Sequence, residues 1–127
     1  AFDASPKASK DPEFQKAKTQ IAKQDWSAAV ATLEPFTAAH QKDADGFNLL
    51  GYSYRHLKRY DESLAAYEKT LAINPKHRGA HEYIGEAYVL TGNKAKAGEH
   101  LAALERICGG RSCEEYQDLA RAIAQAK

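Results

Sequence analysis

The sequence predicts an all-α protein built as a helix-turn-helix superhelix, an α-solenoid of three helix pairs with a C-terminal capping helix. The first observation is a repeat, because Ala17, Gly51 and Gly85 are evenly spaced, about 34 residues apart. Three further sets keep the same spacing: Trp26, Tyr60 and Lys94; Ala29, Ser63 and Ala97; Leu33, Tyr67 and Leu101. Small and aromatic residues at this period are typical of stacked helical hairpins. The second observation is that apolar residues within each repeat follow helical spacing rather than the alternation of a strand.

The composition excludes several classes of protein. A chain of 127 residues fits one domain, and its 43% hydrophobic content is enough for a core. The 18 Lys and Arg residues nearly balance the 17 Asp and Glu residues, which argues against a nucleic-acid partner. No apolar run approaches the roughly 18 residues that a membrane span requires. We therefore expect a single domain over 11–127, with no nucleic-acid partner and no membrane span.

The start of the chain favours export. Residues 1–10 are small, polar and charged, which predicts a flexible lead-in. The sequence contains no methionine, and its first residues resemble the end left when a signal peptide is removed. A trimmed chain is the alternative. Together with two closely spaced cysteines, this start favours a periplasmic or secreted location over a cytoplasmic one.

The first helix pair is predicted over about 11–43. Asp11 is placed to cap a helix whose first residue is a proline. That helix is expected to end near Lys23, and the second to begin near Trp26. Pro35 lies deep within the second helix, where it lacks a backbone donor and crowds the preceding turn. We therefore expect a kink or an early stop there.

The central pair, about 44–77, has the clearest pattern. Its first helix carries an apolar face of Phe47, Leu50, Tyr54 and Leu57. Its second helix carries Leu64, Tyr67 and Leu71. Pro75 pushes residue 74 out of helical conformation and ends the pair.

The third pair, about 78–108, is followed by a capping helix over about 113–126. A turn at Gly92 divides the pair, and Gly109 and Gly110 end it. The segment from Ser112 to Glu115 matches a capping box. The last helix has one apolar and one polar face, as the end of a stacked array requires.

The central unit resembles the tetratricopeptide repeat (TPR) family. The residues that carry the resemblance are Phe47, Leu50, Gly51, Tyr54, Tyr60, Tyr67 and Pro75. The third unit keeps most of this pattern, whereas the first is degenerate, and the chain as a whole resembles a small exported bacterial protein of this family. Gly51 and Gly85 are expected to let the first helix of a pair approach the second. Tyr54, Tyr67 and Tyr88 are expected to fill the space between neighbouring pairs.

The resemblance implies that a peptide lies in a concave groove lined by the first helix of each pair. By the family's register, the groove candidates are Lys18, Asp45, Asn48, Tyr52, Arg55, Glu82 and Glu86. Tyr52 lies outside the apolar face of its helix, so it is a candidate anchor unless the lead-in or a neighbouring helix covers it. The carboxylates at 45, 82 and 86 suggest a basic or amide-rich partner, with simple solvation as the alternative. Glutamates stand where the family's carboxylate clamp needs cations, so we do not expect that clamp.

The histidines and cysteines are each compatible with more than one role. His77 and His81 have the spacing of a metal edge, but two ligands are too few, so we expect surface histidines and no metal site. For Cys108 and Cys113 the first interpretation is a disulfide that ties the capping helix to the array. Alternatively, Cys113 at a helix N-terminus is a reactive thiol, or the pair binds a metal.

No catalytic motif or phosphate loop occurs in the chain. We therefore expect neither an enzyme nor a cofactor, but a non-catalytic adaptor that binds a peptide or protein segment. The alternatives are a self-assembling scaffold that forms a homo-oligomer, and a redox-active dithiol protein using Cys108 and Cys113.

Overall fold

The computed structural model describes residues 10–126, and every element in that range is a helix, as the sequence predicts. The predicted flexible lead-in lies outside the described residues, apart from Lys10, which forms a turn. The helices are α2 (Pro12–Ala22), α3 (Trp26–Ala39), α4 (Ala44–His56), α5 (Tyr60–Ile73), α6 (Arg78–Leu90), α7 (Lys94–Cys108) and α8 (Glu114–Gln125). None of these helices is long and apolar enough to cross a membrane.

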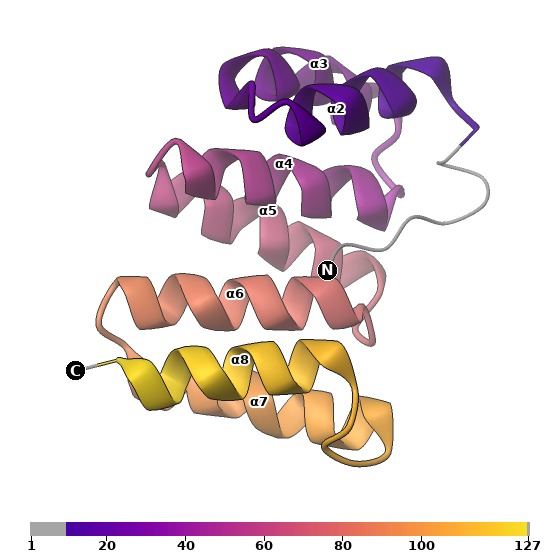
Figure 1. Ribbon diagram of the computed structural model, residues 1–127. Coiled ribbons are helices and arrows are strands. Elements are labelled where there is room, and N and C mark those ends of the chain that lie inside the picture. The colour runs from indigo at the N-terminus through magenta and orange to yellow at the C-terminus, as the bar shows by residue number, and fades with distance from the viewer. Residues whose placement is uncertain (1–9, 127) are drawn as a thin grey trace.

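The helices form three hairpins that stack along one axis (Figure 1). The pairs α2–α3, α4–α5 and α6–α7 are each in contact along their length. Neighbouring hairpins meet through α3 and α4, and then through α5 and α6. The last helix, α8, packs against both α6 and α7 and closes the stack. This arrangement is the predicted superhelix of three pairs and a capping helix.

Side-chain caps explain where most of the helices begin. Asp11 accepts hydrogen bonds from the backbone N–H groups of Glu13 and Phe14, so it caps α2 as predicted. The helices α3, α4 and α7 begin at equivalent caps from Asp25, Asp43 and Asn93. Each acceptor satisfies a backbone donor that the first helical turn cannot pair internally.

Of the two outcomes expected at Pro35, a kink or an early stop, the early stop does not occur, because α3 continues to Ala39. Pro35 and Ala31, whose carbonyl loses its usual donor, both lie on the exposed side of the helix. Water can therefore satisfy that carbonyl. Leu33 and Phe36 are buried on the opposite side, and their packing keeps the helix continuous.

The predicted capping box before α8 is also wrong. The N-cap of α8 is Cys113, one residue later than expected, and no side chain forms a capping hydrogen bond there. Cys113 is bonded to Cys108 at the end of α7, with 6.2 Å between their Cα atoms. The disulfide, rather than a serine hydroxyl, therefore fixes the start of the capping helix.

The repeat glycines mark the closest helix contacts. A Cβ at Gly51 would lie 2.8 Å from the ring of Tyr67 on α5, as expected for close approach within a pair. A Cβ at Gly85 would lie 2.6 Å from Leu119. The close neighbour of Gly85 is therefore the capping helix and not its own partner helix α7, which corrects the expectation.

The three tyrosines fill the space between neighbouring pairs, as expected. Tyr54 donates a hydrogen bond of 2.5 Å to Glu34 on α3, and Tyr67 is fully buried with its ring 6.1 Å from Tyr83 on α6. Tyr88 stacks on His100 of α7 within its own pair. Tyr88 also packs against the buried cluster of Tyr67, Tyr83 and Ile84 between the second and third units, so it joins α6 to α7 in addition.

Candidate functional site

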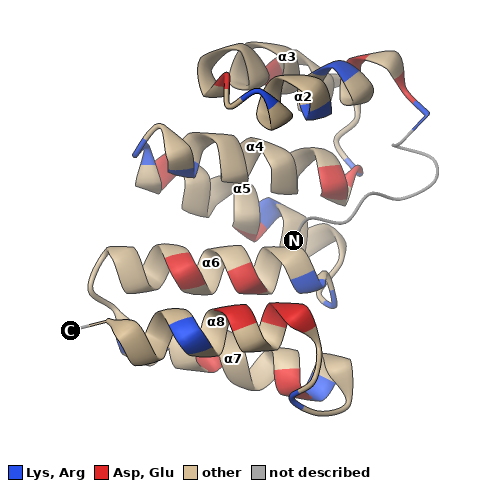
Figure 2. Ribbon diagram, viewed as in Figure 1, with Lys and Arg blue, Asp and Glu red and all other residues tan. Residues whose placement is uncertain are grey.

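All seven groove candidates lie on the first helices of the three pairs, and we call the surface of α2, α4 and α6 the A-helix face. In the view of Figure 1, α4 lies in front of α5 and α8 lies in front of α7, with α6 between these two layers of the stack. Helices α4 and α6 are in contact. Lys18 is on α2, four candidates are on α4, and Glu82 and Glu86 are on α6. Figure 2 shows these two glutamates as separate acidic bands along α6.

An ion pair and two tyrosines join α4 to α6 on this face. Arg55 donates to Glu86 with 2.7 Å between Nη1 and Oε1, and the two side chains are 21% and 14% exposed. The guanidinium lies 5.9 Å from the ring centre of Tyr83. Tyr52 packs on the same ring at 4.9 Å. We call Tyr52, Arg55, Tyr83 and Glu86 the inter-unit cluster.

Burial and charge change the acidity of the groups in and beside this cluster. Burial raises the pKa of Tyr52 and of Tyr83, so both rings are neutral at ordinary pH. Burial, and then a hydrogen bond with Glu86 and its charge, raises the pKa of Glu82 to about 9. Burial opposes the charge of Arg55, but Glu86 outweighs it and raises the pKa of the guanidinium.

Three candidates are largely buried, because Asp45, Asn48 and Glu82 are 6%, 0% and 3% exposed. The remaining four, Lys18, Tyr52, Arg55 and Glu86, are half-buried. Sequence register placed all seven on the correct helices, but it could not separate the buried positions from the accessible ones.

Asp45 forms a buried contact between units. Its Oδ1 lies 2.8 Å from Nε2 of His77, the residue that caps α6. Nδ1 of His77 accepts from the backbone N–H of Ala80, so Nε2 carries the proton and donates to Asp45. We call this the Asp45–His77 bridge. It holds the start of α4 against the start of α6.

The expectation of surface histidines at 77 and 81 is wrong, because these residues are 4% and 8% exposed. His81 lies with Nε2 2.7 Å from the carbonyl oxygen of Pro75 and Nδ1 3.0 Å from Nδ1 of His100. The carbonyl can only accept, so Nε2 of His81 donates and His100 supplies the proton between the two rings. Burial, and then neighbouring positive charge, lowers the pKa of both imidazoles, to about 4 for His100.

Asn48 is the unusual polar group of this face. It is fully buried, and neither its carboxamide oxygen nor its nitrogen has a hydrogen-bond partner. It occupies on α4 the repeat position that Glu82 occupies on α6. A buried amide without protein partners costs free energy, so this position is an exception among the buried polar groups.

Sequence reasoning missed Tyr83 and the role of Trp26. The Trp26 ring stacks on His56 at 3.9 Å, and its edge meets Tyr52 at 5.7 Å, so it extends the inter-unit cluster toward α3. The sequence did contain a pattern that could have identified Tyr83 as a packed residue, because Tyr83 lies with Ala80 and Ala87 on one apolar face of a helix. The contacts of Trp26 depend on how the units pack, which the repeat pattern does not give.

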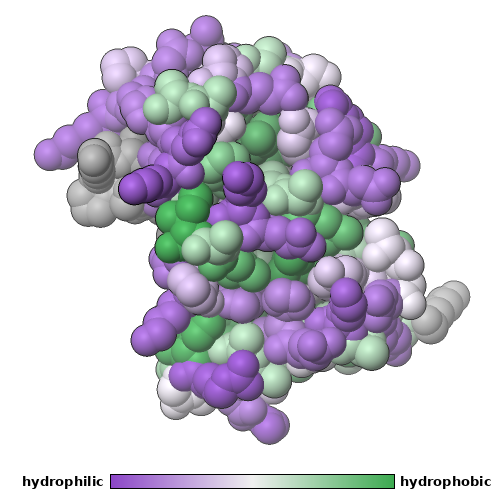
Figure 3. Space-filling view, turned by 180° about the vertical axis from the view of Figure 1, so that it is seen from behind, coloured by the Kyte–Doolittle hydropathy of each residue, from purple (hydrophilic) through white to green (hydrophobic). Residues whose placement is uncertain are grey.

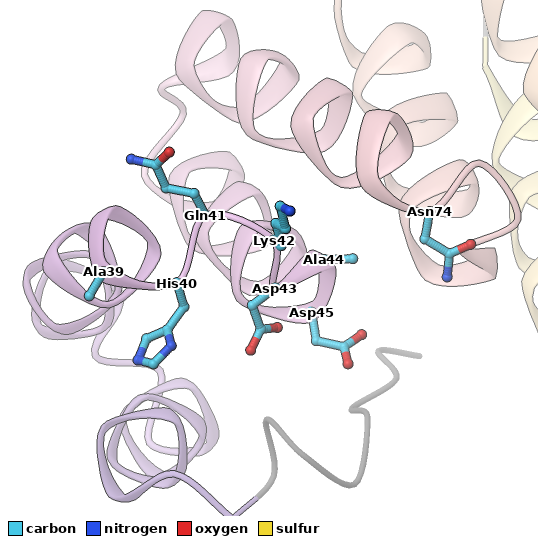
Figure 4. A pocket seen from close by; sticks show the side chains of 8 residues that line it. All are labelled: Ala39, His40, Gln41, Lys42, Asp43, Ala44, Asp45 and Asn74. Atoms are coloured by element: carbon cyan, nitrogen blue, oxygen red, sulfur yellow. The ribbon is translucent and has the colours of Figure 1, made fainter.

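Two cavities lie away from the inter-unit cluster. One cavity of about 450 Å³ lies where α3 leads into α4, beside the end of α5. Figure 4 shows its lining: Ala39, His40, Gln41, Lys42, Asp43, Ala44, Asp45 and Asn74. The carboxylates of Asp43 and Asp45 are committed to the cap of α4 and to His77. No group of three or more metal-ligating side chains occurs within residues 10–126.

A second cavity of about 270 Å³ lies between α4 and α5. Its lining is mainly apolar: Phe47, Leu50, Tyr54, Glu62, Ala65, Ala66 and Lys69. Figure 3, seen from behind, shows hydrophobic residues gathered across the middle of that face. None of the groove candidates lines this second cavity.

These features define a class of protein: an α-solenoid of stacked helical hairpins with a polar and aromatic surface on its first helices. The model of the tetratricopeptide repeat matches residues 14–78 and 59–112. The chain belongs to the tetratricopeptide repeat family. Proteins of this family are generally non-catalytic interaction modules. No curated protein sequence matches the chain.

Solved structures show the same fold at low identity. The TPR2B domain of yeast Sti1, in complex with pHsp70, has a TM-score of 0.81 and 23% identity, with 97% of this chain and 100% of that chain covered. The Yersinia enterocolitica secretion chaperone SycD, with a peptide of the translocator YopD, has a TM-score of 0.78 and 16% identity, covering 90% and 86%. MamA from Desulfovibrio magneticus RS-1 has a TM-score of 0.74 and 21% identity, covering 80% of this chain. This chain spans 57% of that MamA chain.

Proposed function

We propose that this chain is a non-catalytic interaction module that binds a peptide or protein segment on its A-helix face. The observation that carries the proposal is the inter-unit cluster, where charged and aromatic side chains from two units meet at a partly exposed surface. Arg and Tyr are the residue types that most often dominate binding energy at such surfaces. The cluster is already formed, so little conformational entropy is lost on binding.

Structural neighbours support the same use of the fold. Two of them are complexes, yeast Sti1 with pHsp70 and SycD with a YopD peptide. A third, the first TPR of Spaghetti (RPAP3), is bound to the HSP90 peptide SRMEEVD. Those partners belong to those proteins. For this chain we infer only the shared use of the fold, in which stacked helical hairpins form a peptide-binding surface.

A basic or amide-rich segment is the partner that we favour. Glu86 on α6 is half-buried and belongs to the inter-unit cluster, and Arg55 is the cation beside it. Tyr52 offers an apolar ring with a polar end for the partner to pack on. Lys18 on α2 lies on the same face and would favour an acidic group at the other end of the segment.

Export from the cytoplasm is part of the proposal. The disulfide between Cys108 and Cys113 supports it, because such a bond persists in oxidising compartments and is rare in the cytosol. A periplasmic or secreted location follows. Detection of the protein in periplasmic and culture fractions, beside a cytoplasmic marker, tests this location directly.

A capture experiment tests the binding face. The wild type and the variants Tyr52→Ala and Glu86→Lys are immobilised and exposed to the native extract. Glu68→Lys is the matched control, because Glu68 is exposed on α5 and undergoes the same change of charge. We expect the wild type and Glu68→Lys to retain the same partner, and Tyr52→Ala and Glu86→Lys to lose it. Retention of that partner by all four proteins would show that the face is assigned wrongly.

A redox function is the second candidate, because Cys113 is the N-cap of α8, where a helix lowers the pKa of a reduced thiol. Titration of the reduced protein with a thiol reagent across pH separates the two roles. A thiol of ordinary acidity and a disulfide that resists exchange favour a structural bond. A strongly acidic thiol with fast exchange favours redox activity.

A further inference from the structure

The second cavity, between α4 and α5, has an apolar interior and charged residues at its edge. Leu50, Tyr54 and Ala66 line it and belong to the buried core. Glu62 and Lys69 also line it, but they occupy exposed positions of α5. Its volume of about 270 Å³ is below the roughly 300–1,000 Å³ of sites for drug-sized ligands. The cavity is therefore large enough for one or two side chains.

Comparison of the three units shows why this space is present in the second one. The repeat position of Ala66 is held by Thr32 in the first unit and by His100 in the third. Oγ1 of Thr32 donates to Oε1 of Gln20 on α2 at 2.8 Å, and the ring of His100 stacks on Tyr88 of α6 at 5.8 Å. In both outer units the second helix therefore extends a side chain to the first. The methyl group of Ala66 is too short to do so.

The acidic groups beside the cavity already have donors. The guanidinium of Arg59 donates to both carboxylate oxygens of Glu62, at 2.7 Å and 2.5 Å. Glu34 on α3 accepts from the hydroxyl of Tyr54 at 2.5 Å. An incoming cation would have to compete with these donors. Because its hydroxyl is engaged in that hydrogen bond, Tyr54 offers an apolar ring to a ligand.

The cation at the edge of the cavity is available to a ligand. Nζ of Lys69 lies 6.0 Å from the centre of the Phe47 ring, which also lines the cavity. None of the ion pairs within residues 10–126 includes Lys69. A carboxylate that approaches the apolar interior would therefore find an ammonium group beside it.

We propose that this cavity is a second binding site, which takes one large apolar side chain of a partner peptide segment and pairs a neighbouring carboxylate of that segment with Lys69. Apolar recesses with polar edges mark interaction sites. A second copy of the chain fits less well, because its exposed Leu90 is followed by the cations Lys94 and Lys96. The site lies away from the inter-unit cluster, so the inference does not rest on the proposed function.

The test uses the full chain labelled with nitrogen-15 and three blocked tetrapeptides. Acetyl-Ala-Leu-Asp-Ala-amide is the probe, and its counterparts have alanine in place of leucine or asparagine in place of aspartate. NMR titration follows the backbone amides, and we expect the largest shifts at Leu50, Ala65, Ala66 and Lys69. The alanine peptide should bind at least tenfold more weakly, because it buries fewer carbon atoms. The asparagine peptide should bind about two- to fivefold more weakly, as loss of an exposed ion pair predicts.

Variants of the chain separate the cavity from its surroundings. Ala66→His and Ala66→Thr introduce the residues of the third and first units, and they should weaken binding of the leucine peptide, at least tenfold for histidine. Two sizes are used because the smaller residue keeps the test valid if the ring disturbs folding, which circular dichroism monitors. Ala72→His, at an exposed position of α5, is the matched control and should change nothing.

The role of the cation has its own pair of variants. Lys69→Gln should make the aspartate and asparagine peptides bind equally. Lys76→Gln, in the exposed turn after α5, is the matched control and should preserve the difference between them. An unchanged preference for aspartate in Lys69→Gln would contradict the assignment of the carboxylate.

Several outcomes would overturn the inference. They are shifts confined to the A-helix face, equal binding of the leucine and alanine peptides, full binding by a folded Ala66→His variant, and no binding by the leucine peptide. Self-association of the wild type that Ala66→His abolishes, measured by sedimentation, would assign the cavity to a second copy instead. None of these results decides the proposed function, because the capture experiment with Tyr52→Ala tests a different surface.

Discussion

At the scale of single residues, the repeat glycines give the sharpest prediction. Gly51→Ala should lower the free energy of unfolding by about 1–3 kcal/mol, because the added methyl group would lie 2.8 Å from the buried ring of Tyr67. Gly98→Ala is the matched control, since a Cβ there meets nothing within 4 Å. It should stabilise α7 by about 0.5–1 kcal/mol. Urea unfolding of both variants checks this, and equal effects would contradict the packing described for Gly51.

A second residue-scale prediction concerns the truncation of a core side chain. Tyr67 is fully buried between α4, α5 and α6, so Tyr67→Ala should cost about 3–5 kcal/mol. Tyr60→Ala, at a half-buried position at the start of α5, should cost markedly less. Thermal and urea unfolding measure both. A similar loss in the two variants would show that the interface between units is not centred on Tyr67.

The histidine pair predicts a dependence of stability on pH. The pKa of His81 and of His100 is lowered in the folded protein, so the pair contributes stability above about pH 6.5, the usual pKa of histidine, and loses it as the pH falls toward 4. After allowance for partial exposure, we expect a loss of about 1 kcal/mol between pH 7 and pH 5. Glu82 acts in the opposite sense, because its raised pKa makes the folded form hold a proton. The comparison of wild type with His100→Gln isolates the histidines. The variant should lose less stability on acidification, and an equal loss would contradict the assignment.

The residue scale is also where sequence reasoning was least complete. The positions of Gly51 and Tyr67 follow from the repeat register alone. The Asp45–His77 bridge does not, because it joins residues 32 apart in the chain and depends on how two units rotate against each other. The same holds for the contact of His81 with His100, because His81 was expected at the surface and His100 lies 19 residues further along the chain.

At the scale of elements, the disulfide and α8 act together. The bond holds the start of α8 to the end of α7, and Leu119 of α8 then covers Gly85. Replacement of both cysteines by serine should lower the free energy of unfolding by about 2 kcal/mol, the loss expected for a short closed loop. Urea unfolding of the double variant, beside the reduced wild type, measures this. Unchanged stability would mean that packing of α8 alone fixes the cap.

The helix boundaries show which starts and ends of helices a sequence pattern can predict and which it cannot. Register and caps placed the helix starts well, because Asp and Asn caps act locally. The sequence could not decide between a kink and an early stop at Pro35, since the continuation of α3 depends on tertiary burial of Leu33 and Phe36. The start of α8 was missed by one residue because a covalent bond, rather than a serine cap, determines it.

At the scale of the whole molecule, the stack depends on its last helix. Each unit of a solenoid is stabilised mainly by its neighbours, and terminal units need a polar outer side. Removal of residues 109–127 should expose the apolar side of α6 and α7 that α8 covers, so the shortened chain should unfold at lower urea and associate in solution. Circular dichroism and light scattering test this. A shortened chain that stays monomeric and equally stable would show that α8 is not a cap.

The overall architecture was the most predictable level, because a regular period and helical spacing act along the whole chain. The class of site was also predictable, since the repeat places Tyr52, Arg55 and Glu86 on one face. The degree of burial of Asn48 and Glu82 was not. It depends on the separation of α4 and α6, and no residue pattern encodes that distance.

The Asp45–His77 bridge has a mechanical consequence for the array. It ties the beginnings of α4 and α6 through a hydrogen bond shielded from water, so those two helices cannot spread apart at that end without leaving a buried carboxylate without its donor. The other end, near Arg55 and Glu86, is held by a more accessible contact that exchanges partners with less cost. When the curvature between the second and third units changes, α4 and α6 should therefore pivot about the Asp45–His77 bridge and separate most at the Arg55 end.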